Sequence, residues 1–140
     1  MSKYKKSFIS LACVFCSNIT AVYATQMEDG YTWTASDNTG NNFFIHYPSI
    51  QFDAINPNLV YAWFKYIPAS SKGYTQTRQI IDCSNLLSAV TNIIAFDRFG
   101  KAISRVQTPI QFVATNPNSV GEMGYKAACT HKAYLQRVVP

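Results

Sequence analysis

Apolar and polar residues alternate with a period of two along much of the chain from residue 31 to residue 107. Clusters of Gly, Pro, Asn and Ser interrupt this alternation at short intervals, and aromatic and β-branched residues dominate between them, so we expect several short β-strands. The segment Leu59–Ile67 is apolar on both faces, which predicts a central strand or one that a partner covers. The six predicted strands are Tyr31–Ser36, 42–47, Leu59–Ile67, 75–84, 89–96 and 101–107.

The segments between these strands have the composition of turns. The clusters at 37–40 and 97–100 predict hairpin turns. Residues 49–54 are expected to extend the second strand past Pro48, with a bulge or bend there because proline has no N–H to donate. Residues 68–74, rich in Ser, Lys and Gly, predict a loop.

Helical periodicity is confined to the C-terminal part of the chain. Ser119 and Glu122 form a capping-box pattern, and apolar residues follow at helical spacing. Gly121 and Gly124 each weaken a helix by about 1 kcal/mol relative to alanine, so we expect this helix to depend on packing. Cys129 falls off the apolar stripe and is expected at or beyond the helix end. The predicted fold class is therefore α+β, mainly β.

The first 24 residues have the pattern of a secretory signal peptide. Three lysines precede an apolar run at 8–14, and the small residues Val22 and Ala24 stand where a signal peptidase cleaves. The run is too short and too polar for a membrane span. We expect a signal peptide at 1–24 and a single domain at 25–140.

An alternative for the N-terminus is lipidation at Cys13. Residues 10–13 loosely resemble a lipoprotein box, but Ser10 stands where a large aliphatic residue is usual, and only six residues separate Lys6 from Cys13. Soluble export to the periplasm or cell surface is therefore the better prediction.

Cleavage after residue 24 changes both the cysteine count and the charge. It removes Cys13 and Cys16, and an exported chain is expected to pair the remaining Cys83 and Cys129. Three of the twelve basic residues also leave, so nine face seven acidic residues and the net charge falls from +5 to +2. With no basic run in the remaining chain, we expect no nucleic-acid partner.

The sequence contains little that indicates a catalytic or metal-binding site. His46 and His131 are its two histidines, and neither has a second ligand at a metal-binding spacing. No GxSxG, phosphate-loop or dinucleotide-binding motif occurs. We expect no enzyme activity, metal or cofactor. The opposing hypothesis, a hydrolase, predicts a concave pocket around His46 or His131.

The order of elements over residues 31–131 resembles the surface-adhesin protein E family of Gram-negative bacteria. The matching features, in order, are Trp33, Phe43-Phe44-Ile45-His46 before Ser49-Ile50, Val60 and Trp63, Ile81-Asp82-Cys83, the hairpin Phe96-Asp97-Arg98-Phe99-Gly100, Pro117-Asn118-Ser119-Val120-Gly121-Glu122, and Cys129. The chain departs from the family in its poor lipoprotein box and in having His46-Tyr47-Pro48 where an acidic residue usually precedes the Ser-Ile pair.

The resemblance implies a small antiparallel sheet of about six strands with a packed C-terminal helix, sometimes dimeric. It also implies a surface or periplasmic location and a binding role, of which adhesion to host matrix and serum glycoproteins is the best known. No ligand-binding motif of the family can be carried over residue by residue.

Aromatic and basic residues supply the candidate binding site. Tyrosine and tryptophan provide amphipathic anchors at interfaces, and lysines could contact acidic glycoproteins, although these residues also suit an ordinary sheet surface. The candidates are Tyr61, Trp63, Lys65, Tyr66, Lys72 and Tyr74.

The sequence thus predicts an exported, non-enzymatic, adhesin-like protein that contacts host glycoproteins, with a possible homodimer formed through Leu59–Ile67. The alternative is a periplasmic inhibitor or accessory subunit of a cell-envelope enzyme, with the 68–74 loop projecting toward its partner.

Overall fold

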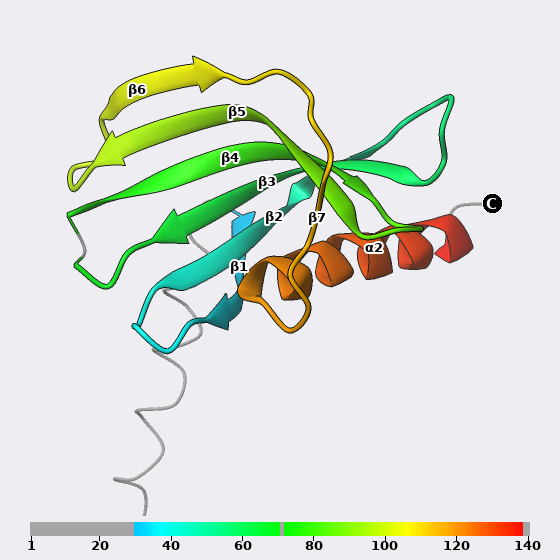
Figure 1. Cartoon of the computed structure of the whole chain (residues 1–140), viewed down its shortest axis with the longest axis horizontal. Coiled ribbons are helices and arrows are strands. Elements are labelled where there is room, and N and C mark those ends of the chain that lie inside the picture. The colour runs from blue at the N-terminus through cyan, green and yellow to red at the C-terminus, as the bar shows by residue number, and fades with distance from the viewer. Residues whose placement is uncertain (1–29, 71, 139–140) are drawn as a thin grey trace, which may run out of the picture.

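The computed structural model describes residues 30–70 and 72–138, with side chains as far as Lys132. Six antiparallel strands follow one another in chain order across a single sheet, and one helix closes the chain (Figure 1). A two-residue strand, β7, pairs with the start of β5. The elements are β1 (Tyr31–Ser36), β2 (Asn42–Phe52), β3 (Leu59–Ile67), β4 (Gly73–Asp82), β5 (Leu87–Asp97), β6 (Ala102–Gln107), β7 (Val113–Ala114) and α2 (Val120–Val138). The predicted fold class is confirmed.

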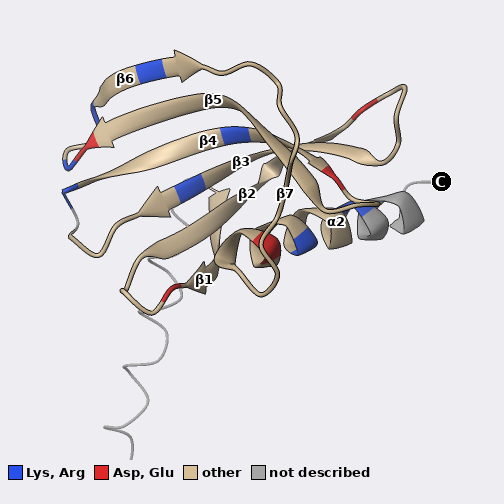
Figure 2. Ribbon diagram, viewed as in Figure 1, with Lys and Arg blue, Asp and Glu red and all other residues tan. Residues whose placement is uncertain are grey.

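Helix α2 lies on one face of the sheet, against β1, β2 and β3 (Figure 1). We call this side the helix face and the opposite side the outer face. Ile45, Val60, Ile81 and Ala128 are fully buried between the helix and the helix face and form the core. Among the described residues, every acidic side chain belongs to a strand end, a turn or α2 (Figure 2). The middle of the sheet is therefore free of carboxylates.

Strand β3 is a central strand, as its two apolar faces predicted. It pairs with β2 on one edge and with β4 on the other. Strand β2 continues past Pro48 to Phe52, and its register with β3 is interrupted between His46 and Gln51. The predicted irregularity at this proline is confirmed.

A disulfide joins Cys83, which follows β4, to Cys129 on α2. The predicted pairing is confirmed, and the bond spans 46 residues of sequence. The expected position of Cys129 at or beyond the helix end is wrong, because it is the tenth of 19 residues in α2. Tyr125, Ala128 and Cys129 are spaced by three and four residues, so they share the helix surface that packs on the core.

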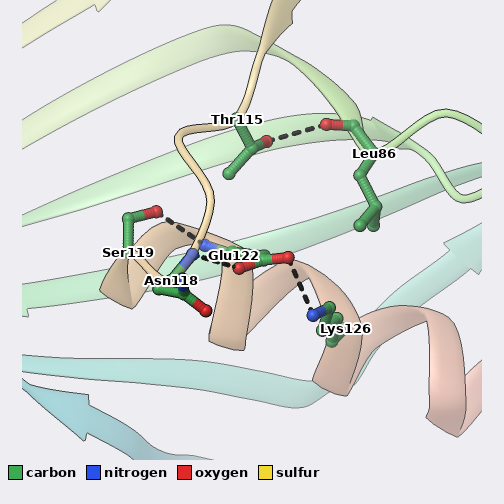
Figure 3. Close-up of polar contacts among 6 residues, drawn as sticks. All are labelled: Leu86, Thr115, Asn118, Ser119, Glu122 and Lys126. Carbon is green, nitrogen blue, oxygen red and sulfur yellow. Dashed lines mark hydrogen bonds and ion pairs between the residues drawn. The ribbon is translucent and has the colours of Figure 1, made fainter.

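The start of α2 carries the predicted capping box (Figure 3). The Glu122 N–H donates to Ser119 Oγ at 3.2 Å, and the Glu122 carboxylate accepts the Asn118 N–H at 2.5 Å. Lys126 lies 2.7 Å from the same carboxylate. The hydrogen bonds from Lys126 and Asn118 lower the pKa of Glu122 below its usual value. The helix start is thus fixed by local side-chain chemistry that the sequence already shows.

The segment leading into α2 is held to the β4–β5 turn by one hydrogen bond (Figure 3). Thr115 Oγ1 donates to the Leu86 carbonyl at 2.8 Å. Leu86 has a φ of +51°, in the left-handed region that residues with a side chain rarely adopt. The bond therefore joins the approach to the helix to a constrained turn.

The predicted signal peptide and Cys13 lie outside the described residues, so the domain boundaries remain predictions. Within residues 30–70 and 72–138, no helix combines the length and the apolar character that crossing a membrane requires.

The β1–β2 turn gives a pH-dependent contribution to stability. Asp37 accepts hydrogen bonds from the Thr39 hydroxyl (2.7 Å), the Asn41 amide (2.7 Å) and the N–H groups of both residues. These bonds, first of all that from the Thr39 side chain, lower the pKa of Asp37 from 3.8 to about 2. A lowered folded-state pKa stabilises the protein above the unfolded value, and this contribution is lost as the pH falls.

We therefore expect Asp37→Asn to reduce the loss of Tm between about pH 4 and about pH 2. Thermal melts of both proteins from pH 7 to pH 2 measure this difference. Because Asp53 and Asp82 also have lowered pKa values, the Asp37→Asn variant should still lose some stability in acid. An equal loss of Tm in the two proteins as the pH falls would contradict the role of Asp37.

Candidate binding surface

The outer face carries two rows of side chains that cross all six long strands. In an antiparallel sheet, residues directly opposite one another on neighbouring strands point to the same face. The first row is Trp33, Phe44, Lys65, Gln76, Ile94 and Arg105. The second row is Tyr31, His46, Trp63, Arg78, Asn92 and Gln107. We call these 12 residues the outer-face rows; they combine aromatic rings, three cations and amides.

Lys65 is held between aromatic rings near the middle of this face. Its Nζ lies 4.6 Å from the ring centroid of Tyr74 and 5.3 Å from that of Tyr31. The Tyr74 ring stacks on Phe96 with centroids 4.6 Å apart and planes 12° apart. These cation–π contacts restrict the ammonium group while leaving its charge uncancelled.

Arg78 is positioned in the same way on the neighbouring strand. Its guanidinium lies 5.8 Å from the ring centroid of Tyr61, and its Nη2 donates to Gln51 Oε1 at 3.4 Å. Tyr61 in turn donates its hydroxyl to Asp53 at 2.9 Å, which raises the pKa of Tyr61. N–H groups of Asn56 and Ile55 lower the pKa of Asp53. This carboxylate, just after β2, is thus engaged by the Tyr61 hydroxyl and by backbone N–H groups, and among the described residues it forms no ion pair with Arg78.

Comparison of the whole chain with known proteins gives a likeness in structure alone. No protein-family model and no curated protein matches the sequence. One crystal structure of Haemophilus influenzae protein E (crystal form II) superposes with a TM-score of 0.55 at 13% identity, covering 75% of this chain and 91% of that one. The fold is that of protein E. A second structure, of protein E from non-typeable Haemophilus influenzae, gives a TM-score of 0.49 at 14% identity, over 79% and 90% of the two chains.

The resemblance in fold expected from the order of elements is confirmed by the first of these structures. At 13% identity the likeness concerns the fold, so the functional residues must be argued from this chain.

Within the protein E fold, four of the six candidate residues gather on the outer face: Tyr61, Trp63, Lys65 and Tyr74. Tyr66 lies on the helix face, where its ring centroid is 5.0 Å from that of Phe43. Lys72 is exposed in the β3–β4 loop, outside the outer-face rows. The predicted set therefore divides between two faces and a loop.

The sequence-based candidates omitted Trp33, Phe44 and His46, although these residues complete the rows on β1 and β2. Trp33 is 45% exposed, which is unusual for so large an apolar side chain. Alternation within β1 and β2 places these residues on one face of each strand. Only the register between strands places them beside Trp63 and Lys65.

The helix face contains a separate apolar groove of about 330 Å³ beside the start of α2. Its walls include Phe43, Phe64, Tyr66, Val120 and Tyr125. The Tyr125 hydroxyl donates to Gln79 Oε1 at 2.7 Å and accepts from Ser88 Oγ at 3.0 Å, so it ties the helix to β4 and β5. A Cβ on Gly124 would lie 3.1 Å from Phe64, and the glycine thus permits this close approach.

The two histidines lie on opposite faces of the sheet. His46 packs against Tyr31 on the outer face, with ring centroids 4.8 Å apart. His131 packs against Tyr47 at 4.8 Å and lines an open hollow of about 410 Å³ with Ala127 and Thr130. No group of three metal-ligating side chains gathers in the part of the chain that the structure describes. The histidines therefore form no catalytic pair.

Proposed function

We propose that this chain is an exported, non-enzymatic binding protein of the adhesin type, which contacts host matrix or serum glycoproteins through its outer face. The observation that carries the proposal is the pair of outer-face rows, which combine aromatic rings, among them the exposed Trp33, with cations that form no ion pair among the described residues. Aromatic and arginine side chains dominate binding energy at protein surfaces. The protein E fold and the signal-peptide pattern support the same function.

The proposal includes removal of residues 1–24 and a soluble domain at 25–140, without a lipid anchor at Cys13. Protease digestion of intact cells, compared with cells whose outer membrane has been permeabilised, tests the location. Digestion on intact cells is the result expected for an adhesin. Protection until permeabilisation would indicate the periplasm and contradict direct contact with host glycoproteins.

A homodimer through Leu59–Ile67 must use the outer face of β3, because both edges of this strand are paired within the sheet and α2 packs against its other face. Such a dimer would cover Trp63 and Lys65. Sedimentation of the exported protein, with and without a bound glycoprotein, measures whether self-association and ligand binding compete.

The alternative, a periplasmic inhibitor or accessory subunit, relied on a projecting loop at 68–74. Strand β4 begins at Gly73, which shortens that loop. The Ala69 N–H donates to Asn41 Oδ1 at 2.9 Å and so links the loop to the β1–β2 hairpin. No observation on the described residues favours this alternative.

Binding of the exported protein to immobilised matrix and serum glycoproteins tests the proposed function. We expect Trp33→Ala/Trp63→Ala to weaken binding by about 100-fold or more, because hot-spot aromatics contribute about 2 kcal/mol or more each and such contributions are not fully additive. The control is Phe99→Ala, an aromatic residue that is 79% exposed in the β5–β6 turn, outside the rows. Equal binding by both variants, or none by the wild type, would contradict the proposal.

A further inference from the structure

The outer-face rows concentrate positive charge, and among the described residues no carboxylate forms an ion pair with it. Lys65, Arg78 and Arg105 belong to the outer-face rows, and the rows contain no Asp or Glu. Within the part of the chain that the structure describes, the one ion pair joins Lys126 to Glu122 on α2, on the opposite side of the sheet. The three cations therefore attract an anionic ligand.

Two of these cations are already held in place. Lys65 lies over the rings of Tyr74 and Tyr31, and the Arg78 guanidinium lies near the Tyr61 ring. Restricting a long side chain before binding reduces the entropy lost when a ligand binds. A guanidinium also presents parallel N–H donors that match the two oxygens of a carboxylate or sulfate group. The outer face thus offers preorganised binding sites for carboxylate or sulfate groups.

The remaining members of the rows suit a sugar ring. Trp33, Phe44 and Trp63 provide aromatic faces, whose negative electrostatic potential attracts the C–H groups on one side of a pyranose. Gln76, Asn92 and Gln107 provide amides, which both donate to and accept from hydroxyl groups. The rings lie on β1–β3 and the amides on β4–β6 of the same cross-strand rows, so one extended saccharide could contact both.

The position of the charges favours a saccharide over a protein surface as the direct contact. The centre of a protein–protein interface is depleted in lysine, aspartate and glutamate, whereas aromatic residues and arginine are enriched there. On the outer face a lysine, Lys65, occupies β3, one of the two central strands, with its ammonium over aromatic rings. We infer that this face binds an acidic carbohydrate, a pyranose chain bearing carboxylate or sulfate groups, carried by the host glycoprotein. This inference rests on the proposed function and names the part of the glycoprotein that is recognised.

Titration calorimetry with three polysaccharides tests the inference: heparin (sulfated), hyaluronan (carboxylated) and dextran (neutral). We expect the exported protein to bind at least one acidic chain and not dextran. Lys65→Gln/Arg78→Gln should weaken that binding by about 10–100-fold, because each charge-assisted hydrogen bond contributes about 1.5–3 kcal/mol and water replaces part of it. The same variant should show a smaller decrease of affinity with added salt.

Arg98→Gln/Lys126→Gln is the matched control. It removes the same net charge, from the β5–β6 turn and from α2, and leaves the outer-face rows intact. We expect its affinity to stay within about twofold of the wild type. Equal weakening by both double variants would overturn the inference, because it would show a response to net charge alone. Trp33→Ala provides a second test on an exposed ring, should the lysine substitution impair folding.

Binding to an immobilised glycoprotein before and after enzymatic removal of its glycans separates this inference from the proposed function. Loss of binding on deglycosylation, together with binding to an acidic polysaccharide, is the expected result. Unchanged binding to the deglycosylated protein would overturn the inference and leave the adhesin function intact. Absence of binding to either form would contradict both.

Discussion

Replacing both Cys83 and Cys129 with serine is expected to lower the free energy of unfolding by about 4 kcal/mol. The bond closes a loop of 46 residues, and the chain-entropy model assigns roughly this value to a loop of that length. For a domain of this size, such a loss would lower Tm by roughly 15–20 °C. Thermal melts followed by circular dichroism measure the change.

A second pair of substitutions, Cys83→Ala/Cys129→Ala, is the control for the polarity of serine next to the core. The two double variants should be destabilised to a similar extent. Reductant should lower the Tm of the wild type but not that of either variant. Free thiols in the native exported protein, or melting of the variants at the wild-type temperature, would contradict a stabilising bond between α2 and the sheet.

Ile45→Ala is expected to cost about 2–5 kcal/mol, since it leaves a cavity where an aliphatic side chain is fully buried. Ile45 has no exposed surface and packs with Val60, Ile81 and Ala128 between the sheet and α2. Urea denaturation followed by tryptophan fluorescence measures the loss. Because Ile45 points to the helix face, the folded fraction of this variant should bind ligand as the wild type does.

Ile103→Ala is the matched control for this core substitution. Ile103 is 65% exposed on β6, so its truncation should change the free energy of unfolding by no more than about 0.5 kcal/mol. Similar losses in the two variants would contradict the assignment of the core to the space between α2 and β1–β3.

The sequence by itself determined the features that depend on short stretches of chain. Alternation with a period of two located the six long strands, and the asparagine- and glycine-containing clusters located the hairpin turns. The Ser119 and Glu122 pair located the start of α2, because a capping box involves residues three apart. Counting cysteines after removal of the predicted signal peptide gave the Cys83–Cys129 bond without any knowledge of distance.

The tertiary structure alone decided which of these elements meet and which face each presents. Cys129 lies in the middle of α2 because the helix continues to Val138, and the pattern around Val120 did not indicate that length. Tyr66 and Tyr74 were equivalent candidates in the sequence, yet alternation and register direct them to opposite faces. The outer-face rows combine single residues from six strands. Register between strands depends on which face the helix covers and on the bulges in each ladder, and these are set by contacts between residues far apart in the chain.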